Sequence, residues 1–303
     1  MITFFTTAKP FRGHSAVIQR NALKSWTLLH PHVEVILFGD DEGAAEVCRD
    51  LGLRHEFHVE RHESGMKYLN YMFSRAQQIA RHDYLCYSNC DIVLMDDFWK
   101  AFEKVAAWRK RFLMVGRRWD TDVTQPIDFA DAHWASGLRS LALTTGFHQQ
   151  PGWIDFFVFS KGLYDHVPPL VVGRSYWDNW LVWTALSARV PAVDCTDFVV
   201  PVHQNHDYGY HPQGKWGTGA DPLAKRNEEL SGESAGTVLD CTHRLTADGR
   251  IRRTLFRRLT ARLWSPQEFW FALKRVTFPW RNRFGLRRQS LRRLLKHPAK
   301  PVD

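Results

Sequence analysis

The chain of 303 residues is long enough for one large domain or two smaller ones. Apolar residues make up 44% of it, including 13 Trp and 20 Phe, which excludes wholesale disorder and provides for a packed core. There is no run of about 20 apolar residues to span a bilayer, and the N-terminus does not resemble a signal peptide. The five cysteines lack Cys-x-x-Cys spacing, so we expect a cytoplasmic protein with neither a disulfide framework nor a zinc ribbon.

The charge is distributed unevenly along the chain. The net charge is +9, but residues 251–303 carry +13, which leaves −4 for residues 1–250. We therefore predict an α/β domain over residues 1–220 and a basic amphipathic helical tail over residues 251–303. Residues 221–250, which are rich in Gly, Ser and charged residues, are predicted to be a loop or linker.

Strands and helices alternate in the first 115 residues. Strands are predicted over residues 2–7, 33–38, 57–59, 84–94 and 112–115, and helices over residues 15–29, 42–51, 67–81 and 98–111. Such alternation is typical of a parallel sheet with crossover helices. We predict an α/β fold with a Rossmann-like, mostly parallel central sheet flanked by helices.

The pattern is looser in the second half of the chain. A loop with a helix is predicted over residues 121–138, and a Trp-rich helix over residues 176–186. Short apolar runs predict strands over residues 153–159 and 198–202. From about residue 209 to residue 249 the composition favours loops.

The strand over residues 84–94 contains an unusual polar pair, Asn89 and Asp91. An ionised carboxylate is costly in an apolar interior unless it is paired or bound to a metal. We therefore expect Asp91 to lie where the strand leaves the core, facing a ligand or a cation. In open α/β sheets, ligands bind at the carboxyl ends of the strands.

Four segments together resemble the GT-A class of nucleotide-sugar glycosyltransferases, and more narrowly bacterial GT-A-like transferases. They are SNCDIVL, GWIDFFVF, GRSYWDNWL and VVPVHQNHDY, and the resemblance covers about residues 1–210. It implies a GT-A-like catalytic domain over residues 1–220. The family's Asp-x-Asp motif corresponds to Asn89-Cys90-Asp91, in which an amide replaces the first carboxylate.

The resemblance implies a divalent metal that neutralises the diphosphate leaving group. Asp91 is the first predicted ligand, Asn89 assists it or contacts the ribose, and His203 and His206 match the late histidine that many GT-A enzymes add. A mixed oxygen and imidazole set favours Mn²⁺ over Mg²⁺. The alternative interpretation is that Asp91 caps a turn and the histidines are hydrogen-bonded loop residues.

Two further carboxylates are candidates for catalysis. Asp178, at the start of the Trp-rich helix, is the predicted base that deprotonates the acceptor if the enzyme inverts configuration; otherwise it is an N-terminal helix cap. Asp155, in the apolar run over residues 153–159, is predicted to bind sugar hydroxyls or to act as the base. Arg117 and Asp120 are placed for a further sugar contact.

The nucleotide is expected over the ends of the first strands. The candidate contacts, each with solvation as the alternative, are Thr6, Thr7, Lys9, Arg12, Asp40, Lys67 and Asn70. No P-loop motif is present.

The tail over residues 251–303 interleaves Arg with Leu, Phe and Trp. Helices of this kind lie in the interface of an anionic membrane, so we expect a peripheral location on the inner face of the cell membrane. A helical subdomain packed on the body is the alternative, and nucleic-acid binding is disfavoured because no RNA-binding motif accompanies the charge.

The sequence thus predicts a metal-dependent glycosyltransferase of the hexosyltransferase type. It would move a sugar from a nucleotide-diphosphate sugar to a glycan or lipid-linked acceptor in bacterial surface polysaccharide synthesis. The alternatives are a sugar nucleotidyltransferase and a non-catalytic nucleotide- or sugar-binding protein on the same scaffold.

Overall fold

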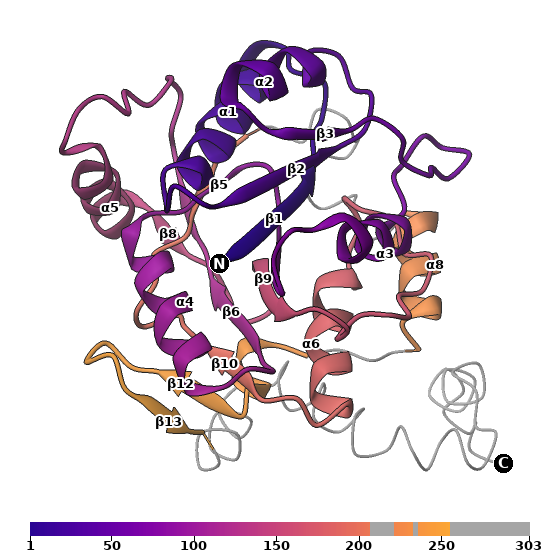
Figure 1. Ribbon diagram of the computed structural model, residues 1–303, viewed down its shortest axis with the longest axis vertical. Coiled ribbons are helices and arrows are strands. Elements are labelled where there is room, and N and C mark those ends of the chain that lie inside the picture. Colours follow the sequence, from indigo (N-terminus) through magenta and orange to yellow (C-terminus); the bar gives the residue numbers. More distant parts are fainter. Residues whose placement is uncertain (207–220, 233–235, 255–303) are drawn as a thin grey trace, which may run out of the picture.

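A computed structural model describes residues 1–206, 221–232 and 236–254 (Figure 1). Within these residues, one large sheet has the strand order β13-β12-β10-β6-β9-β4-β1-β2-β3. Its strands are β1 (Ile2–Thr7), β2 (Glu34–Phe38), β3 (Arg54–Glu56), β4 (Tyr84–Ser88), β6 (Leu113–Arg117), β9 (Ile154–Ser160), β10 (Ala192–Asp194), β12 (His243–Leu245) and β13 (Ile251–Arg253).

Most neighbours in this sheet are parallel. The pairs β1–β2, β1–β4, β2–β3, β6–β10 and β10–β12 are parallel, whereas β9 runs antiparallel to both β4 and β6, and β13 runs antiparallel to β12. The prediction of a mostly parallel α/β sheet is confirmed. Because β9 is reversed, its first residues lie at the same edge as the carboxyl ends of β4 and β6.

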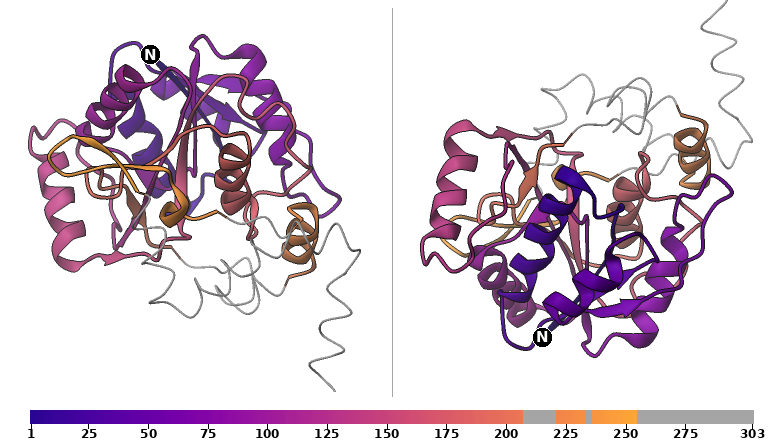
Figure 2. Two further views of the ribbon diagram at one scale, coloured as in Figure 1. Left: turned by 90° about the horizontal axis from the view of Figure 1, so that it is seen from below. Right: turned by 90° about the horizontal axis from the view of Figure 1, so that it is seen from above.

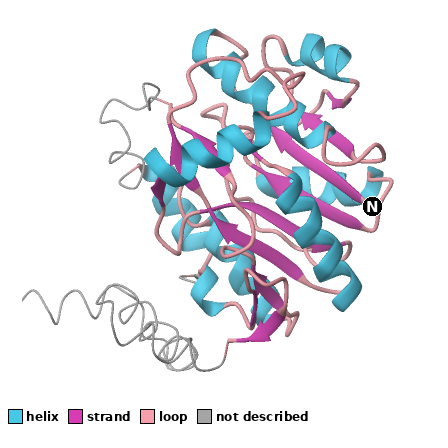
Figure 3. Cartoon of the chain, turned by 90° about the vertical axis from the view of Figure 1, so that its left-hand side faces the viewer, coloured by secondary structure: helices cyan, strands magenta, loops and turns pink. Residues whose placement is uncertain are grey.

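Helices cover both faces of the sheet (Figure 2), and the strands run between them (Figure 3). One face packs against α1 (Gly13–Thr27), α2 (Ala44–Leu51) and α4 (Asp96–Trp108), and the other against α3 (Leu69–Ile79) and α6 (Trp177–Ser187). Successive strand residues point to opposite faces of the sheet. Phe4 packs in the core under α1, α2 and α4, and Phe5 packs in the core under α3 and α6. Burial on both faces explains the continuous apolar runs.

A smaller sheet continues from the carboxyl ends of two central strands. It has the order β5-β11-β7-β8, formed by β5 (Ile92–Val93), β11 (Val202–Gln204), β7 (Trp119–Thr121) and β8 (Phe147–His148). Strand β4 leads into β5 through the turn at residues 89–91, and β6 leads into β7 through Arg118. Helix α5 (Trp134–Thr145) packs on it around Leu138 and Ala142.

The structure corrects several predicted boundaries. The strand predicted over residues 84–94 is interrupted after Ser88, because the chain turns there before β5. The strands predicted over residues 57–59 and 198–202 lie instead at residues 54–56 and 202–204, where backbone pairing with β2 and β7 is available. The short strands β7 and β8 were not predicted.

The range predicted as a loop or linker holds regular structure. It contains α8 (Pro222–Leu230), the 3-10 helix η1 (Val238–Asp240) and β12, which pairs with β10. Helix α8 begins where the side chain of Asp221 accepts a hydrogen bond from the Leu223 N–H at 2.7 Å, with Pro222 in the first turn.

The predicted tail begins with β13 rather than with a helix, and its residues 255–303 lie outside the described residues. In the described ranges, no helix has both the length and the apolar character needed to cross a bilayer.

Candidate metal centre

Asp91 lies in the turn that joins β4 to β5, as predicted for a carboxylate at the point where a strand leaves the core. Its backbone is fixed by Gln204, whose main-chain N–H and side-chain Nε2 both donate to the Asp91 carbonyl, at 3.2 and 3.1 Å. The same Nε2 donates to the Ile18 carbonyl in α1 at 2.7 Å. These hydrogen bonds hold the main chain of Asp91 and do not involve its carboxylate.

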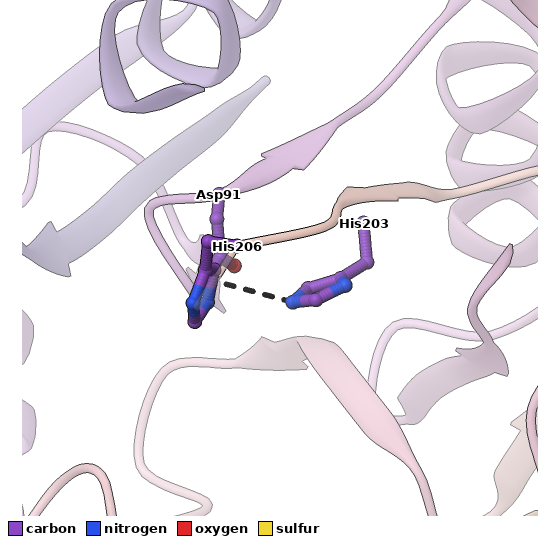
Figure 4. Close-up of side chains that lie close together, drawn as sticks. All are labelled: Asp91, His203 and His206. Carbon is purple, nitrogen blue, oxygen red and sulfur yellow. Dashed lines mark ion pairs between the residues drawn. The ribbon is translucent and has the colours of Figure 1, made fainter. Parts of the chain in front are cut away.

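The two predicted histidines approach this carboxylate from β11 and the residues after it (Figure 4). Strand β11 pairs antiparallel with β5, so that His203 lies opposite Ile92. The Nε2 atoms of His203 and His206 are 3.8 and 3.3 Å from Asp91 Oδ2. The structure thus brings Asp91 together with two histidines that follow it by more than a hundred positions in the sequence.

The geometry fits a divalent cation. One ligand atom from each residue lies within 4.8 Å of the other two. The Oδ1 atom of Asp91 is buried and has no hydrogen-bond partner in the described part of the chain. Such an atom is costly unless something else satisfies it. Two imidazole nitrogens and a carboxylate oxygen suit Mn²⁺, Zn²⁺ and similar ions better than Mg²⁺.

Asp91 is held in its ionised form. Burial opposes its ionisation, but His203, His206 and Lys9 outweigh that effect and lower the pKa of Asp91 below its ordinary value. Lys9 therefore adds positive potential from the loop after β1. The Lys9 backbone is clamped by the buried Gln19 side chain, through hydrogen bonds of 2.6 and 3.0 Å.

A chain of polar side chains begins at Asp120, beside His203. The Arg118 guanidinium bridges two carboxylates, with Nε 2.8 Å from Asp120 Oδ1 and Nη1 2.7 Å from Asp155 Oδ2. Asn89 Nδ2 donates to the other oxygen of Asp155 at 2.5 Å. This chain of contacts therefore returns to the turn that carries Asp91.

These contacts define what Asp155 and Asn89 do in the fold. Both Asp155 oxygens accept hydrogen bonds from protein groups, and its backbone carbonyl accepts from the Asn89 N–H at 2.9 Å. A carboxylate held in this way is suited to fixing the turn. The amide nitrogen of Asn89 is likewise committed to Asp155 rather than directed at the three candidate metal ligands.

Asp178 has a different environment. It lies in the first turn of α6, after Tyr176, whose φ of 84° is in the left-handed region. Burial, aided by the negative charge of Asp155, raises the pKa of Asp178 to about 7. A carboxyl group with a pKa near neutrality can accept a proton at working pH. Its placement beside Asp155 and Arg118 joins it to the same edge of the sheet.

The residues predicted to contact the nucleotide lie at the ends of β1 and β2, and several are engaged with protein groups. The hydroxyls of Thr6 and Thr7 donate to the carbonyls of Ser88 and Phe38, at 2.6 and 2.9 Å. Arg12 forms an exposed ion pair with Glu42. These contacts tie the loop after β1 to its neighbours.

The second group of predicted contacts centres on Lys67. This buried ammonium pairs with Asp41 and donates to the Ala8 carbonyl at 2.6 Å. Asp40 pairs with Arg61 at 2.5 Å, and the side-chain oxygen of Asn70 is buried without a hydrogen-bond partner among the described residues. The roles of these residues towards a nucleotide stay predictions.

Four residues that organise this edge of the sheet were not predicted from the sequence. Each of them makes a polar contact with a residue distant in the sequence and belongs to no local motif: Asp41, Arg61, Arg118 and Gln149. Only the alternation of Arg118 with Asp120, which places both on one side of an extended segment, was available as a signal.

The described part of the chain also contains a cavity of about 630 Å³ away from this centre. It lies between α4, α5 and residues 197–198, and its lining includes Asp96, Asp97 and Arg139. None of the three candidate metal ligands lines it.

No family model and no curated protein matches the chain. Similar solved structures include glucosyl-3-phosphoglycerate synthase from Mycobacterium tuberculosis in complex with Mg²⁺ and uridine diphosphate, at 13% identity and a TM-score of 0.39 over 68% of this chain and 72% of that one. A mannosyltransferase from Pyrobaculum calidifontis in complex with GDP-mannose and Mn²⁺ is 15% identical, with a TM-score of 0.45 over 70% and 59% of the two chains. TarS from S. aureus in complex with UDP is 10% identical, with a TM-score of 0.47 over 77% and 64%. Likeness at this distance does not assign an activity.

Proposed function

We propose that the chain is a metal-dependent glycosyltransferase of the hexosyltransferase type, which moves a sugar from a nucleotide-diphosphate sugar to a glycan or lipid-linked acceptor. The observation that carries this proposal is the convergence of Asp91, His203 and His206 where β4 leaves the core. It agrees with the resemblance of the four sequence segments to GT-A transferases.

The three residues would hold Mn²⁺ or Mg²⁺ against the diphosphate of the donor. A divalent cation there stabilises the negative charge that develops on the leaving diphosphate. Lys9 adds positive charge from the loop after β1. The nucleoside would lie over the ends of β1 and β2, where Thr6, Thr7 and Lys67 are held, with Arg12, Asp40, Asn70 and Asn89 as further candidate contacts.

Asp178 is the proposed base for the acceptor. Its raised pKa suits its carboxylate oxygen to take the proton of the acceptor hydroxyl. The oxygen of that hydroxyl attacks the sugar as the bond from the sugar to the diphosphate breaks. Asp155 keeps Arg118 and Asn89 in place beside Asp178. Its own role as a base is disfavoured because both of its oxygens are engaged.

The basic tail suggests where in the cell the protein would act. Residues 251–303 carry a net charge of +13, which suits binding to an anionic membrane surface. Together with an acceptor carried on a lipid, this favours surface polysaccharide synthesis by a peripheral protein on the cytoplasmic face.

The test is product analysis with a panel of UDP- and GDP-sugars, with and without Mn²⁺. We expect Mn²⁺-dependent release of nucleoside diphosphate that falls at least a hundredfold in Asp91→Asn. The matched control is Asp83→Asn, an exposed carboxylate just before the opposite end of β4. Pyrophosphate formed from a nucleoside triphosphate and a sugar phosphate would identify a nucleotidyltransferase instead. Donor binding without turnover would identify a binding protein.

A further inference from the structure

Asp120 lies next to His203 on the side of the imidazole that faces away from Asp91. The buried His203 Nδ1 atom has no hydrogen bond in the described part of the chain as its ring stands, and the Asp120 Oδ1 atom, 3.1 Å away, is the acceptor within reach. The His203 Nε2 atom is 3.8 Å from Asp91 Oδ2. We propose that Asp120 is a positioning residue that holds a proton on His203 Nδ1 and so presents the Nε2 lone pair to the metal. This inference rests on the metal site of the proposed function.

The backbone places the two residues together. Strands β7 and β11 are parallel neighbours, and their register sets Asp120 directly opposite His203. Both side chains are buried, at 9% and 4% exposure, so that water does not compete for the Nδ1 atom. Directly opposed side chains on adjacent strands are within contact distance without any distortion.

The Asp120 carboxylate is itself fixed. Arg118 Nε donates to Oδ1 at 2.8 Å and Gln149 Nε2 donates to Oδ2 at 2.6 Å. These donors approach from two sides, and Arg118 is anchored in turn by Asp155. Rotation of the carboxylate away from His203 would break at least one of these buried hydrogen bonds.

The position of Asp120 bears on which tautomer the His203 imidazole adopts. A neutral imidazole carries its proton on one nitrogen and offers a lone pair on the other, so the tautomer decides which nitrogen can bind a metal. A carboxylate that accepts from Nδ1–H selects the tautomer with a free Nε2 and makes that nitrogen more basic. Removal of such a partner weakens metal binding by about 10- to 100-fold.

The experiment uses the full chain labelled with ¹⁵N-histidine at pH 8.5. Long-range ¹H–¹⁵N spectra report which His203 nitrogen carries a proton, without metal and with Zn²⁺ as a diamagnetic probe. Calorimetric titration with Mn²⁺ gives the affinity. We expect a proton on Nδ1 in the unsubstituted protein, and in Asp120→Ala both a loss of that preference and an affinity lower by about 10- to 100-fold.

Two further variants keep the test sharp. Asp120→Asn preserves the shape of the side chain and is expected to lower the affinity less than Asp120→Ala does, and Asp128→Asn, an exposed carboxylate in the following loop, should leave the tautomer and the affinity unchanged. An unprotonated Nδ1 in the unsubstituted protein, or an Asp120→Ala protein with unchanged tautomer and affinity, overturns the inference. If neither Mn²⁺ nor Zn²⁺ binds, the proposed function fails together with the metal-binding part of the inference, and the metal-free spectra of the two proteins separately show whether Asp120 sets the His203 tautomer.

Discussion

Asp91 and Asp155 are both carboxylates at the carboxyl edge of the sheet, yet their surroundings differ. Asp155 has hydrogen bonds to both oxygens, whereas Asp91 has a buried oxygen without a partner among the described residues and two imidazoles beside the other oxygen. A buried carboxylate of the first kind stabilises a turn. A carboxylate like that of Asp91, with a buried oxygen that the described part of the chain leaves unsatisfied and two imidazoles beside the other oxygen, is suited to binding a cation.

The carboxyl group of Asp178 should make the stability of the fold depend on pH. Its pKa is about 7 in the folded protein and ordinarily 3.8, because burial disfavours the charged form. The unfolded chain therefore loses this proton first, and the contribution of Asp178 to the free energy of unfolding falls as pH rises from about 4 to about 7. Above that range it stays low.

We expect Asp178→Asn to remove this penalty. Urea unfolding should show the variant gaining about 1–2 kcal/mol relative to the unsubstituted protein between pH 5 and pH 8.5. Asp165→Asn, at an exposed position, is the control. A gain that is the same at both pH values would show that Asp178 has no raised pKa.

The sequence indicated some of these residues and not others, for physical reasons. Asp91 was predictable because a carboxylate in an apolar strand has few stable environments. Arg118 was not, because its function depends on two carboxylates that reach it from β7 and β9. The distances that group His203 and His206 with Asp91 likewise depend on strand pairing that no local pattern encodes.

Among the helices, α1 positions the segment that follows Asp91. The indole of the fully buried Trp26 donates to the Ile92 carbonyl at 2.9 Å, and the Leu94 N–H donates to the hydroxyl of Ser25 at 3.2 Å. Helix α1 therefore holds β5, and β5 in turn pairs with β11, which carries His203.

We expect Trp26→Phe to lower the free energy of unfolding by about 2–4 kcal/mol, because it leaves both a cavity and an unsatisfied carbonyl. Metal affinity should fall as well, because β5 loses a support. Trp99→Phe, at a half-buried position on α4, should cost less than about 1 kcal/mol in the same urea titration. Equal losses in the two variants would contradict this role for Trp26.

The elements themselves were predictable to different degrees. Long buried strands and amphipathic helices such as β1, β2 and α2 have clear periodicity, and the structure confirms them within a few residues. The two-residue strands β5 and β8 have no periodicity of their own and exist because partners lie alongside. The antiparallel direction of β9 could not be predicted either, because an apolar run does not show in which direction the strand runs relative to its neighbours.

The distribution of charge divides the chain into a mildly acidic body and a basic C-terminal segment. The structure refines where these parts meet. Strand β13 pairs with β12, and the Thr254 hydroxyl donates to the Cys241 carbonyl, so the chain up to residue 254 belongs to the body. Thirteen of the Lys and Arg residues follow that point.

Removal of residues 255–303 should therefore abolish binding to anionic membranes while leaving the body folded. In co-sedimentation, the full chain is expected to bind vesicles that contain phosphatidylserine, with binding that weakens as salt rises, because each basic residue near the surface contributes about 1 kcal/mol. Vesicles of phosphatidylcholine alone are the control. Binding that is insensitive to both salt and truncation would contradict the membrane proposal.

The metal centre is tested most directly by a crystal of the full chain soaked with MnCl₂ and UDP and measured at the manganese absorption edge. We expect one anomalous peak among Asp91, His203 and His206, at about 2.0–2.3 Å from the carboxylate oxygen and the two Nε2 atoms. The diphosphate should lie on the side of the peak that faces Lys9. UDP bound with no peak at these three residues, or a peak held by other side chains, would contradict the proposed metal centre.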